Sequence, residues 1–175
     1  MTKRRVVVTG LGLLTPVGND VDSSWSSLKN GISGIGPIEH FDVSSFTTRF
    51  GGSLKGFDCK NFMKPKEARR MDIFMQYGIA AGVQAYEDSG LTHSIFNPER
   101  FGVAIGSGIG GIKTIEDTTL QIRDSGSRKI SPFFVPGSII NMIAGNLSIR
   151  YGLKGPNIAC LLYTSDAATT GVVGV

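Results

Sequence analysis

The sequence predicts an α/β fold, because segments with the pattern of buried strands alternate with segments of helical periodicity. The β-branched run Arg4–Thr9 closes at a glycine turn, which is typical of a buried strand. Phe101–Ile105 predicts a second strand, which runs through Gly106–Gly111 into a helix over 112–123. A third short strand is expected over Asn157–Tyr163, after a glycine-proline turn.

Helical periodicity is strongest between Met71 and Tyr86, where apolar residues recur at the i, i+3, i+4, i+7 spacing. This helix is expected to end at Ser89–Gly90. Gly78 and Gly82 fall on its apolar face, where glycine weakens a helix, so they predict close approach of another element. We interpret the apolar stripe as core.

A shorter amphipathic helix is expected near the N-terminus, with Val21, Trp25 and Leu28 at helical spacing. Asp20 is its candidate N-cap and Gly31 its stop. The helix therefore has a signal at each end.

The remaining segments have weaker patterns. Residues 31–63 predict a long irregular excursion with short strands. Lys129–Pro136 is expected to be extended and bounded by proline. Ser138 is expected to cap a further helix, which stops at Tyr151–Gly152.

The composition is that of one globular domain: 175 residues, 41% hydrophobic and 18% charged. Cys59, Cys160, His40 and His93 have none of the short spacings of a metal site, so no metal is expected. Sparse cysteines favour a reducing, cytoplasmic location. Thr9–Gly12 interrupts the N-terminal apolar run too early for a signal peptide, and no segment approaches the ~18 apolar residues that span a bilayer. No membrane association is expected.

The net charge of +4 is mild, and the basic residues form two groups. One precedes a helix and the other lies in a glycine-serine loop: Lys64, Lys66, Arg69 and Arg70, then Arg123, Arg128 and Lys129. No aromatic residues are interleaved, so nucleic acid is not favoured as a partner. A solvated face and a surface for an acidic protein both remain open.

The run Gly106–Gly111 matches the G-x-G-x-x-G pattern of dinucleotide sites, between a strand and a helix. The pattern alone is weak, and the acidic residue that should end a second strand is missing, since Asp124 is expected in a loop. We interpret the glycines as allowing backbones or a ligand chain to approach closely. No cofactor is expected.

Four segments, in this order, resemble the β-ketoacyl-acyl-carrier-protein synthases, in particular the type II elongating enzymes of bacterial fatty acid synthesis. They are Arg4–Gly18, Ala104–Gly111, Arg128–Pro136 and Asn141–Gly145. The resemblance covers residues 1–159 and implies the thiolase-like fold, five layers α-β-α-β-α made from two similar halves. It implies that residues 1–159 are most of the first half.

The resemblance also implies a function: elongation of fatty acyl chains by a decarboxylating Claisen condensation. A cysteine would take the acyl chain from acyl-carrier protein, two histidines would help decarboxylate the malonyl thioester, and backbone N–H groups would stabilise the oxyanion. The histidines would lie beyond residue 175, and the intact enzymes are homodimers. Ile109 and Phe134 resemble acyl-pocket residues. Exposed cations resemble the carrier-docking surface: Lys66, Arg69, Arg70, Arg128 and Lys129.

The chain departs from the family at the nucleophile. In the family the cysteine follows the glycine of the Gly-Pro turn by nine positions, which from Gly155 is position 164, and this chain has Thr164 there. Cys160 is four residues early, inside the predicted strand, and a helix N-terminus is what activates such a thiol. No catalytic residue is therefore assigned and the chain is expected to be inactive. The alternative is a complete binding module for acyl chains or acyl-carrier protein, without chemistry.

The departure is abrupt, and the segment Cys160–Ala168 resembles the translated sequence of a transposase-based DNA sequencing adapter. The resemblance predicts that residues 160–175 are a non-native tail. The absence of lysine and arginine after Lys154 agrees with it. Genuine divergence or a frameshift is the alternative.

Overall fold

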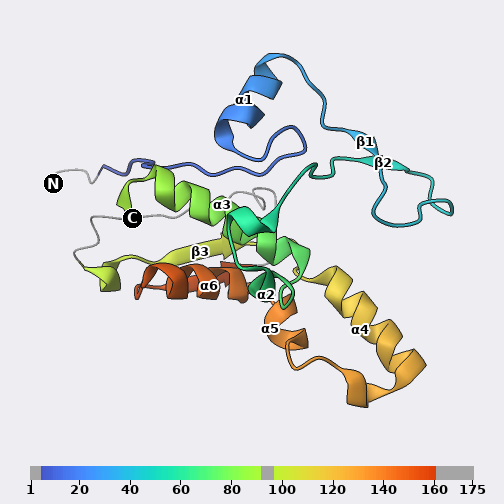
Figure 1. Cartoon of the computed structure of the whole chain (residues 1–175). Helices are drawn as coiled ribbons and strands as arrows, with labels where there is room; N and C mark the ends of the chain where they lie inside the picture. The colour runs from blue at the N-terminus through green and yellow to red at the C-terminus, as the bar shows by residue number, and fades with distance from the viewer. Residues whose placement is uncertain (1–4, 92–96, 161–175) are drawn as a thin grey trace.

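A computed structural model describes residues 5–91 and 97–160 (Figure 1). The elements, in chain order, are α1 (Val21–Lys29), β1 (Gly36–Pro37), β2 (Phe50–Gly51), η1 (Cys59–Asn61), α2 (Pro65–Ala68), α3 (Ile73–Asp88), η3 (Pro98–Arg100), β3 (Val103–Gly106), α4 (Ile112–Ser125), η4 (Ser127–Lys129), α5 (Phe134–Ser138), α6 (Asn141–Tyr151) and β4 (Asn157–Cys160). In the second half of the described chain, the strands β3 and β4 are separated by helical elements, a mixture that fits an α/β fold.

The centre of the fold is the parallel pair β3 and β4, which are in register from Val103 opposite Asn157 to Gly106 opposite Cys160. The connection between them contains α4, α5 and α6, in keeping with the long crossovers of parallel strands. Alternate residues of β3 are buried against the helices, and Ala104 between them is exposed. One face of the pair is therefore covered.

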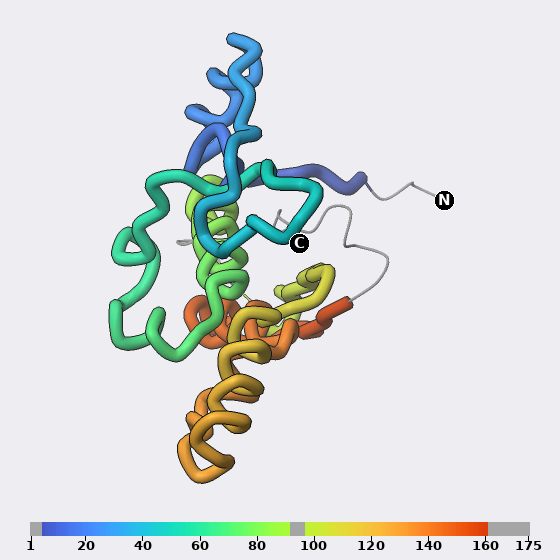
Figure 2. Tube along the Cα trace, turned by 90° about the vertical axis from the view of Figure 1, so that its right-hand side faces the viewer, coloured from blue at the N-terminus to red at the C-terminus, as the bar shows by residue number. Residues whose placement is uncertain are grey.

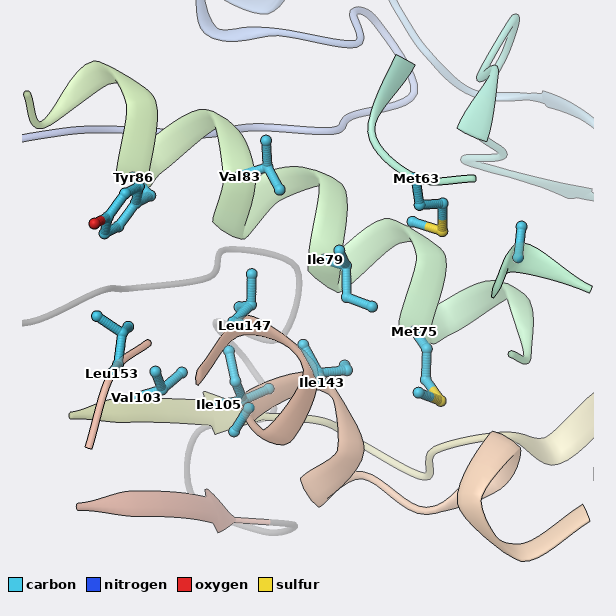
Figure 3. Close-up of a cluster of buried hydrophobic side chains, with 12 residues drawn as sticks. Met63, Met75, Ile79, Val83, Tyr86, Val103, Ile105, Ile143, Leu147 and Leu153 are labelled. Atoms are coloured by element: carbon cyan, nitrogen blue, oxygen red, sulfur yellow. The ribbon is translucent and has the colours of Figure 1, made fainter. Parts of the chain in front are cut away.

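The core lies between α3, α6 and β3, where buried side chains from all three elements meet (Figure 3). Its members include Met75, Ile79 and Val83 of α3, Val103 and Ile105 of β3, and Ile143 and Leu147 of α6. Burial of this apolar surface is the main force that holds the elements together.

The two glycines of α3 face α6. A Cβ on Gly78 would lie 2.7 Å from Cδ1 of Ile143, and a Cβ on Gly82 would lie 2.5 Å from Cδ1 of Leu147. The predicted close approach is therefore confirmed. The predicted helix ends are confirmed as well, because α3 stops before Ser89 and Gly152 ends α6 with a φ of 66°. The start of α3 is capped by Asp72, which was not predicted from the sequence.

Helix α1 begins and ends as expected. The Asp20 carboxylate accepts a hydrogen bond of 2.7 Å from the Ser23 N–H, and Gly31 follows the helix with a φ of 66°. Its apolar face, however, is not buried, since Trp25 is 60% exposed. The buried residue is Ser24, whose hydroxyl donates to the Gly18 carbonyl at 3.1 Å.

The predicted N-terminal strand is wrong for the part that the structure describes. Residues 5–14 form no strand, and Val6 is 86% exposed. The backbone runs against α3 at Gly10, where a Cβ would lie 2.3 Å from the Ala85 carbonyl oxygen, and the Leu11 N–H donates to the Asp88 carboxylate at 2.8 Å. A strand needs a neighbouring strand to bond its backbone, and the described residues place none beside this segment.

Three smaller predictions are also wrong. Phe134–Ser138 is the helix α5, not extended chain, because Pro136 falls in its first turn, where no N–H is needed. Ser138 does not cap α6: its hydroxyl donates to the Phe134 carbonyl at 2.8 Å, and α6 begins three residues later. Asp124 lies in α4, not in a loop.

The excursion over 31–63 is confirmed as largely irregular, with the two-residue antiparallel strands β1 and β2 inside it. The third predicted strand is confirmed as β4, Asn157–Cys160. Its expected continuation to Tyr163, and the rest of the expected tail, lie outside the described residues. Within the described parts, no helix combines the length and apolarity that crossing a membrane would need.

Candidate functional site

Asp72 joins the beginnings of two helices. Its Oδ1 accepts from the Phe74 N–H of α3 at 3.2 Å. Its Oδ2 accepts from both the N–H and the hydroxyl of Thr114 in α4, at 2.9 and 2.7 Å. The side chain is buried, so these bonds are shielded from water and fix how α3 and α4 meet.

The glycine loop before α4 and the residue before α3 are each held against α5 by a main-chain hydrogen bond. The Gly111 N–H donates to the Ser138 carbonyl at 2.9 Å, and the Asp72 N–H donates to the Gly137 carbonyl at 2.9 Å. A Cβ on Gly111 would lie 2.7 Å from the Ser138 Cα. The interpretation that this loop needs glycine for close backbone approach is therefore confirmed at Gly111.

The two predicted acyl-pocket residues lie on these joined segments. Ile109 is in the glycine loop and its side chain is 65% exposed. Phe134 is the first residue of α5 and is half-buried. Neither belongs to the described residues that line the larger of the two cavities described below, so their role in acyl binding stays a prediction.

The larger cavity has a volume of about 830 Å³ and lies at the carboxyl end of β3, the usual side for ligands in α/β folds. Apolar side chains from four segments form part of its wall: Leu14, Phe74, Ile105 and Ile143. Its polar groups include Thr15, His40, Ser53, Tyr77, Ser107 and Lys113. The size is that of a small-molecule site.

Two of these polar groups have shifted acidities. Burial raises the pKa of the Tyr77 phenol, so it stays protonated at neutral pH. The hydrogen bond and the charge of Asp117, whose Oδ2 lies 2.9 Å from the Lys113 Nζ, raise the pKa of Lys113, which stays cationic. Tyr77 thus offers a neutral donor and Lys113 a positive charge, and neither group is an activated nucleophile.

The predicted docking cations divide into two groups. Lys66 lies in α2, and Arg69 and Arg70 follow directly; all are exposed. The Arg70 guanidinium lies over the Phe133 ring, with Cζ 4.2 Å from the centroid. Arg128 and Lys129 lie in η4, which Figures 1 and 2 place at the far end of the projecting α4. The two groups of cations therefore do not form one continuous patch.

A smaller cavity of about 610 Å³ lies between η1, α2 and the end of α6. Lys60, Lys64 and Arg150 line it; Lys64 belongs to the first basic group noted in the sequence, whereas Lys60 and Arg150 were not singled out there. The Arg150 guanidinium donates to the Phe62 carbonyl, which ties α6 to η1. Sequence reasoning missed this group because Lys64 and Arg150 lie far apart in the chain and only the fold brings them together.

Cys160 lies in β4, as expected, and is half-buried. Its carbonyl accepts from the Ser107 N–H at 3.2 Å. Thr164, at the family position of the nucleophile, lies outside the described residues. In the parts of the chain that the structure describes, no group of three or more His, Cys, Asp or Glu side chains could hold a metal ion.

Comparison with known proteins gives a consistent set of similarities. Residues 3–169 match the family model described as "Beta-ketoacyl synthase, N-terminal domain". The chain is 61% identical over 172 residues to the 3-oxoacyl-(acyl-carrier-protein) synthase 2 of Vibrio cholerae, and 49% identical over 172 residues to that of Coxiella burnetii. Each match covers 98% of this chain and 41% of the relative. The chain thus spans about two-fifths of the length of these curated relatives.

Solved structures show the same fold. A ketosynthase in complex with its type II PKS acyl-carrier protein, bound to the hexaketide, is 29% identical with a TM-score of 0.70, over 87% of this chain and 40% of that chain. The ishigamide ketosynthase/chain length factor is 24% identical with a TM-score of 0.77, over 91% of this chain and 39% of that chain. The thiolase-like fold implied by the sequence resemblance is confirmed.

Proposed function

Since this chain belongs to the β-ketoacyl synthase family, we propose that it is the N-terminal part of an acyltransferase that elongates fatty acyl chains. The observation that carries this proposal is the 61% identity, across 98% of the chain, to a 3-oxoacyl-(acyl-carrier-protein) synthase 2. The reaction is a decarboxylating Claisen condensation, with fatty acyl and malonyl thioesters of acyl-carrier protein as substrates. The intact enzyme is a cytoplasmic homodimer.

Acyl-carrier protein docks on the exposed cations that the family resemblance indicates: Lys66, Arg69, Arg70, Arg128 and Lys129. None of them takes part in an ion pair within residues 5–91 and 97–160, so their charges remain available to an acidic partner. Such charges act mainly on the rate of association. Because the two groups lie on different elements, we expect each to contact a separate part of the carrier.

The acyl chain is received by Ile109 and Phe134. Both are apolar, and their segments are held together by the bond between Gly111 and Ser138. The Asp72 carboxylate supports this arrangement by fixing the start of α4, directly after the glycine loop. An apolar side chain among glycines leaves room for an alkyl chain to approach the backbone.

The chain as it stands does not catalyse the condensation. Thr164 occupies the family position of the nucleophile, and Cys160 lies four residues earlier, within a strand. A strand does not provide the helix N-terminus that favours the thiolate. Thr164 also favours a second candidate function, a non-catalytic module that binds acyl chains or acyl-carrier protein.

Residues 1–159 form an incomplete N-terminal half of the synthase domain, and residues 160–175 are a non-native tail. The support is the resemblance of Cys160–Ala168 to translated adapter sequence. The family match nevertheless continues to residue 169, so the sequence of the source DNA is needed to test whether the tail is native. Re-sequencing should restore a strand ending in Thr-Ala-Cys, with the cysteine at 164. DNA that encodes the present tail would rule out this part of the proposal.

Carrier binding tests the proposed function. Replacing Lys66, Arg69 and Arg70 with alanine should weaken binding of acyl-carrier protein about tenfold at low salt and flatten its salt dependence. Lys29→Ala, an exposed change on α1, is the matched control and should leave binding unchanged. Unchanged association of the triple variant at low salt would contradict the docking surface. Mass spectrometry after incubation with acyl-carrier protein should find no acyl group on Cys160.

A further inference from the structure

The smaller cavity combines an apolar floor with a cationic rim. Its apolar lining comes from separate parts of the chain: Phe62, Met63, Met71, Ile79 and Ile149. Ile149 is 81% exposed, although it is a large apolar residue within the helix α6. Water is therefore in contact with apolar surface that a ligand could cover.

The charges around this floor are unbalanced. Lys60, Lys64 and Arg150 contribute three cations, and Glu67 is the one acidic residue that lines the cavity. Glu67 already accepts a hydrogen bond of 3.3 Å from the Lys64 N–H. The rim therefore has an excess of two positive charges, three minus one, and attracts an anion.

The Arg150 side chain is already fixed in position at this rim. Its guanidinium donates to the Phe62 carbonyl, and its Cζ lies 5.8 Å from the centroid of the Tyr151 ring. An arginine has five N–H donors, so this bond leaves others for a ligand. A guanidinium that is already positioned loses less conformational freedom when it binds an anion.

This cavity is distinct from the proposed carrier surface, because no residue of that surface lines it. Lys64, Glu67 and Met71 line the cavity. Lys66, Arg69 and Arg70, from the same stretch of the chain, do not. Either group can be changed without touching the other.

We propose that the cavity between η1, α2 and α6 binds an amphiphile with a single alkyl chain and an anionic head. The alkyl chain covers the apolar floor, including Ile149, and the head contacts Lys60, Lys64 and Arg150. A long-chain carboxylate and an alkyl phosphate share this chemistry. The volume of about 610 Å³ is within the usual range of small-molecule sites. The site is additional to the proposed function and does not depend on it.

Calorimetric titration of the chain with dodecanoate, below its micelle concentration, tests the proposal. Dodecanoate should bind with one-to-one stoichiometry, and 1-dodecanol and butanoate, which lack the head or the chain, should bind at least about tenfold more weakly. Dodecyl phosphate serves as the second source: tighter binding than dodecanoate would identify the phosphate as the preferred head. Equal affinity for dodecanol and dodecanoate would overturn the proposal.

Matched variants locate the site. Lys60→Ala with Lys64→Ala should weaken dodecanoate binding about tenfold, and the variant with Lys66, Arg69 and Arg70 changed to alanine should keep it within about twofold. Ile149→Ser should weaken dodecanoate binding to a similar extent. Ile158 is also exposed but lies outside the cavity, so Ile158→Ser should leave dodecanoate binding unchanged. These changes are on exposed residues, so folding is not at issue. Equal losses of dodecanoate affinity in the test and control variants would refute the site. That result would not bear on the proposed binding of acyl-carrier protein.

Discussion

The half of the chain built from α3, α6, β3 and β4 contrasts with the N-terminal segment, residues 5–51. In the first, apolar side chains are enclosed, and Leu147 is 1% exposed. In the second, comparable side chains such as Val6, Val8 and Trp25 lie largely in water. Both regions have apolar patterns in the sequence, a buried-strand pattern and a short amphipathic helix in the N-terminal segment and the longer helical stripe of Met71–Tyr86 in the packed half. The first finds a complementary surface along its length, whereas the second packs against the described residues at only some positions, such as Gly10 and Leu14.

This difference shows that an apolar pattern in the sequence only makes burial possible. The side chains are buried where another surface packs against them. In the packed half, the glycines of α3 let Ile143 and Leu147 come close, and the area removed from water is the main source of stability. In the N-terminal segment, extended backbone and apolar side chains remain available for contact. In keeping with our proposal that residues 1–159 are an incomplete half, we expect the rest of the domain to cover them.

The largest effect should follow from a cavity in the packed half. Leu147→Ala should lower the free energy of unfolding by about 3 kcal/mol or more, because the methyl groups removed from α6 leave space against Gly82. Urea unfolding measures it. The control is Leu28→Ala on α1, an exposed leucine that should cost no more than about 0.5 kcal/mol. Similar losses of unfolding free energy in both variants would contradict the difference in packing between the two regions.

A smaller effect is expected at the junction of α3 and α4. Asp72→Ala removes the acceptor of the Phe74 and Thr114 bonds and should cost about 2–3 kcal/mol. Thr114→Val removes one of these bonds and should cost less. A double-mutant cycle should show coupling of about 1 kcal/mol between Asp72 and Thr114. Strict additivity would mean that the two helix starts are fixed independently.

In the N-terminal segment the helix cap should matter less. Asp20→Ala should cost about 1 kcal/mol at pH 7, because the Ser23 N–H loses its acceptor. The bond to Ser23 lowers the pKa of Asp20 below its usual value, so the contribution is present at neutral pH and is lost as the pH falls through the lowered pKa. Urea unfolding of both proteins from pH 7 to pH 3 should show the difference shrinking. A difference independent of pH would show that the carboxylate is not the cap.

The smallest effect on stability is expected at the exposed valines. Val6→Lys with Val8→Lys should change the free energy of unfolding by no more than about 0.5 kcal/mol, because neither side chain is buried. The same change should reduce self-association of the chain, since the extended apolar edge is a surface on which copies can pair. Sedimentation at increasing concentration measures this. A wild-type chain that stays monomeric, with a sharp cooperative unfolding transition, would contradict the prediction.

The sequence by itself determined the local features of the fold. The ends of α1 follow from Asp20 and Gly31, and Gly78 and Gly82 predict that another element approaches α3 closely, although not which one. These features depend on a side chain and the backbone within a few residues, or on the space that a missing side chain leaves. The family resemblance supplied the fold class by the order of its motifs, which no single element could have specified.

Tertiary structure alone decided which surfaces meet. The β-branched run at Val6–Val8 reads as a strand, yet a strand exists only where a second backbone bonds it. The bond from Thr114 to Asp72 spans 42 residues, and the bond from Arg150 to Phe62 spans 88. No spacing rule connects residues so far apart, because the chain between them can bring many other pairs together. The folded core selects these pairs, and with them the candidate sites.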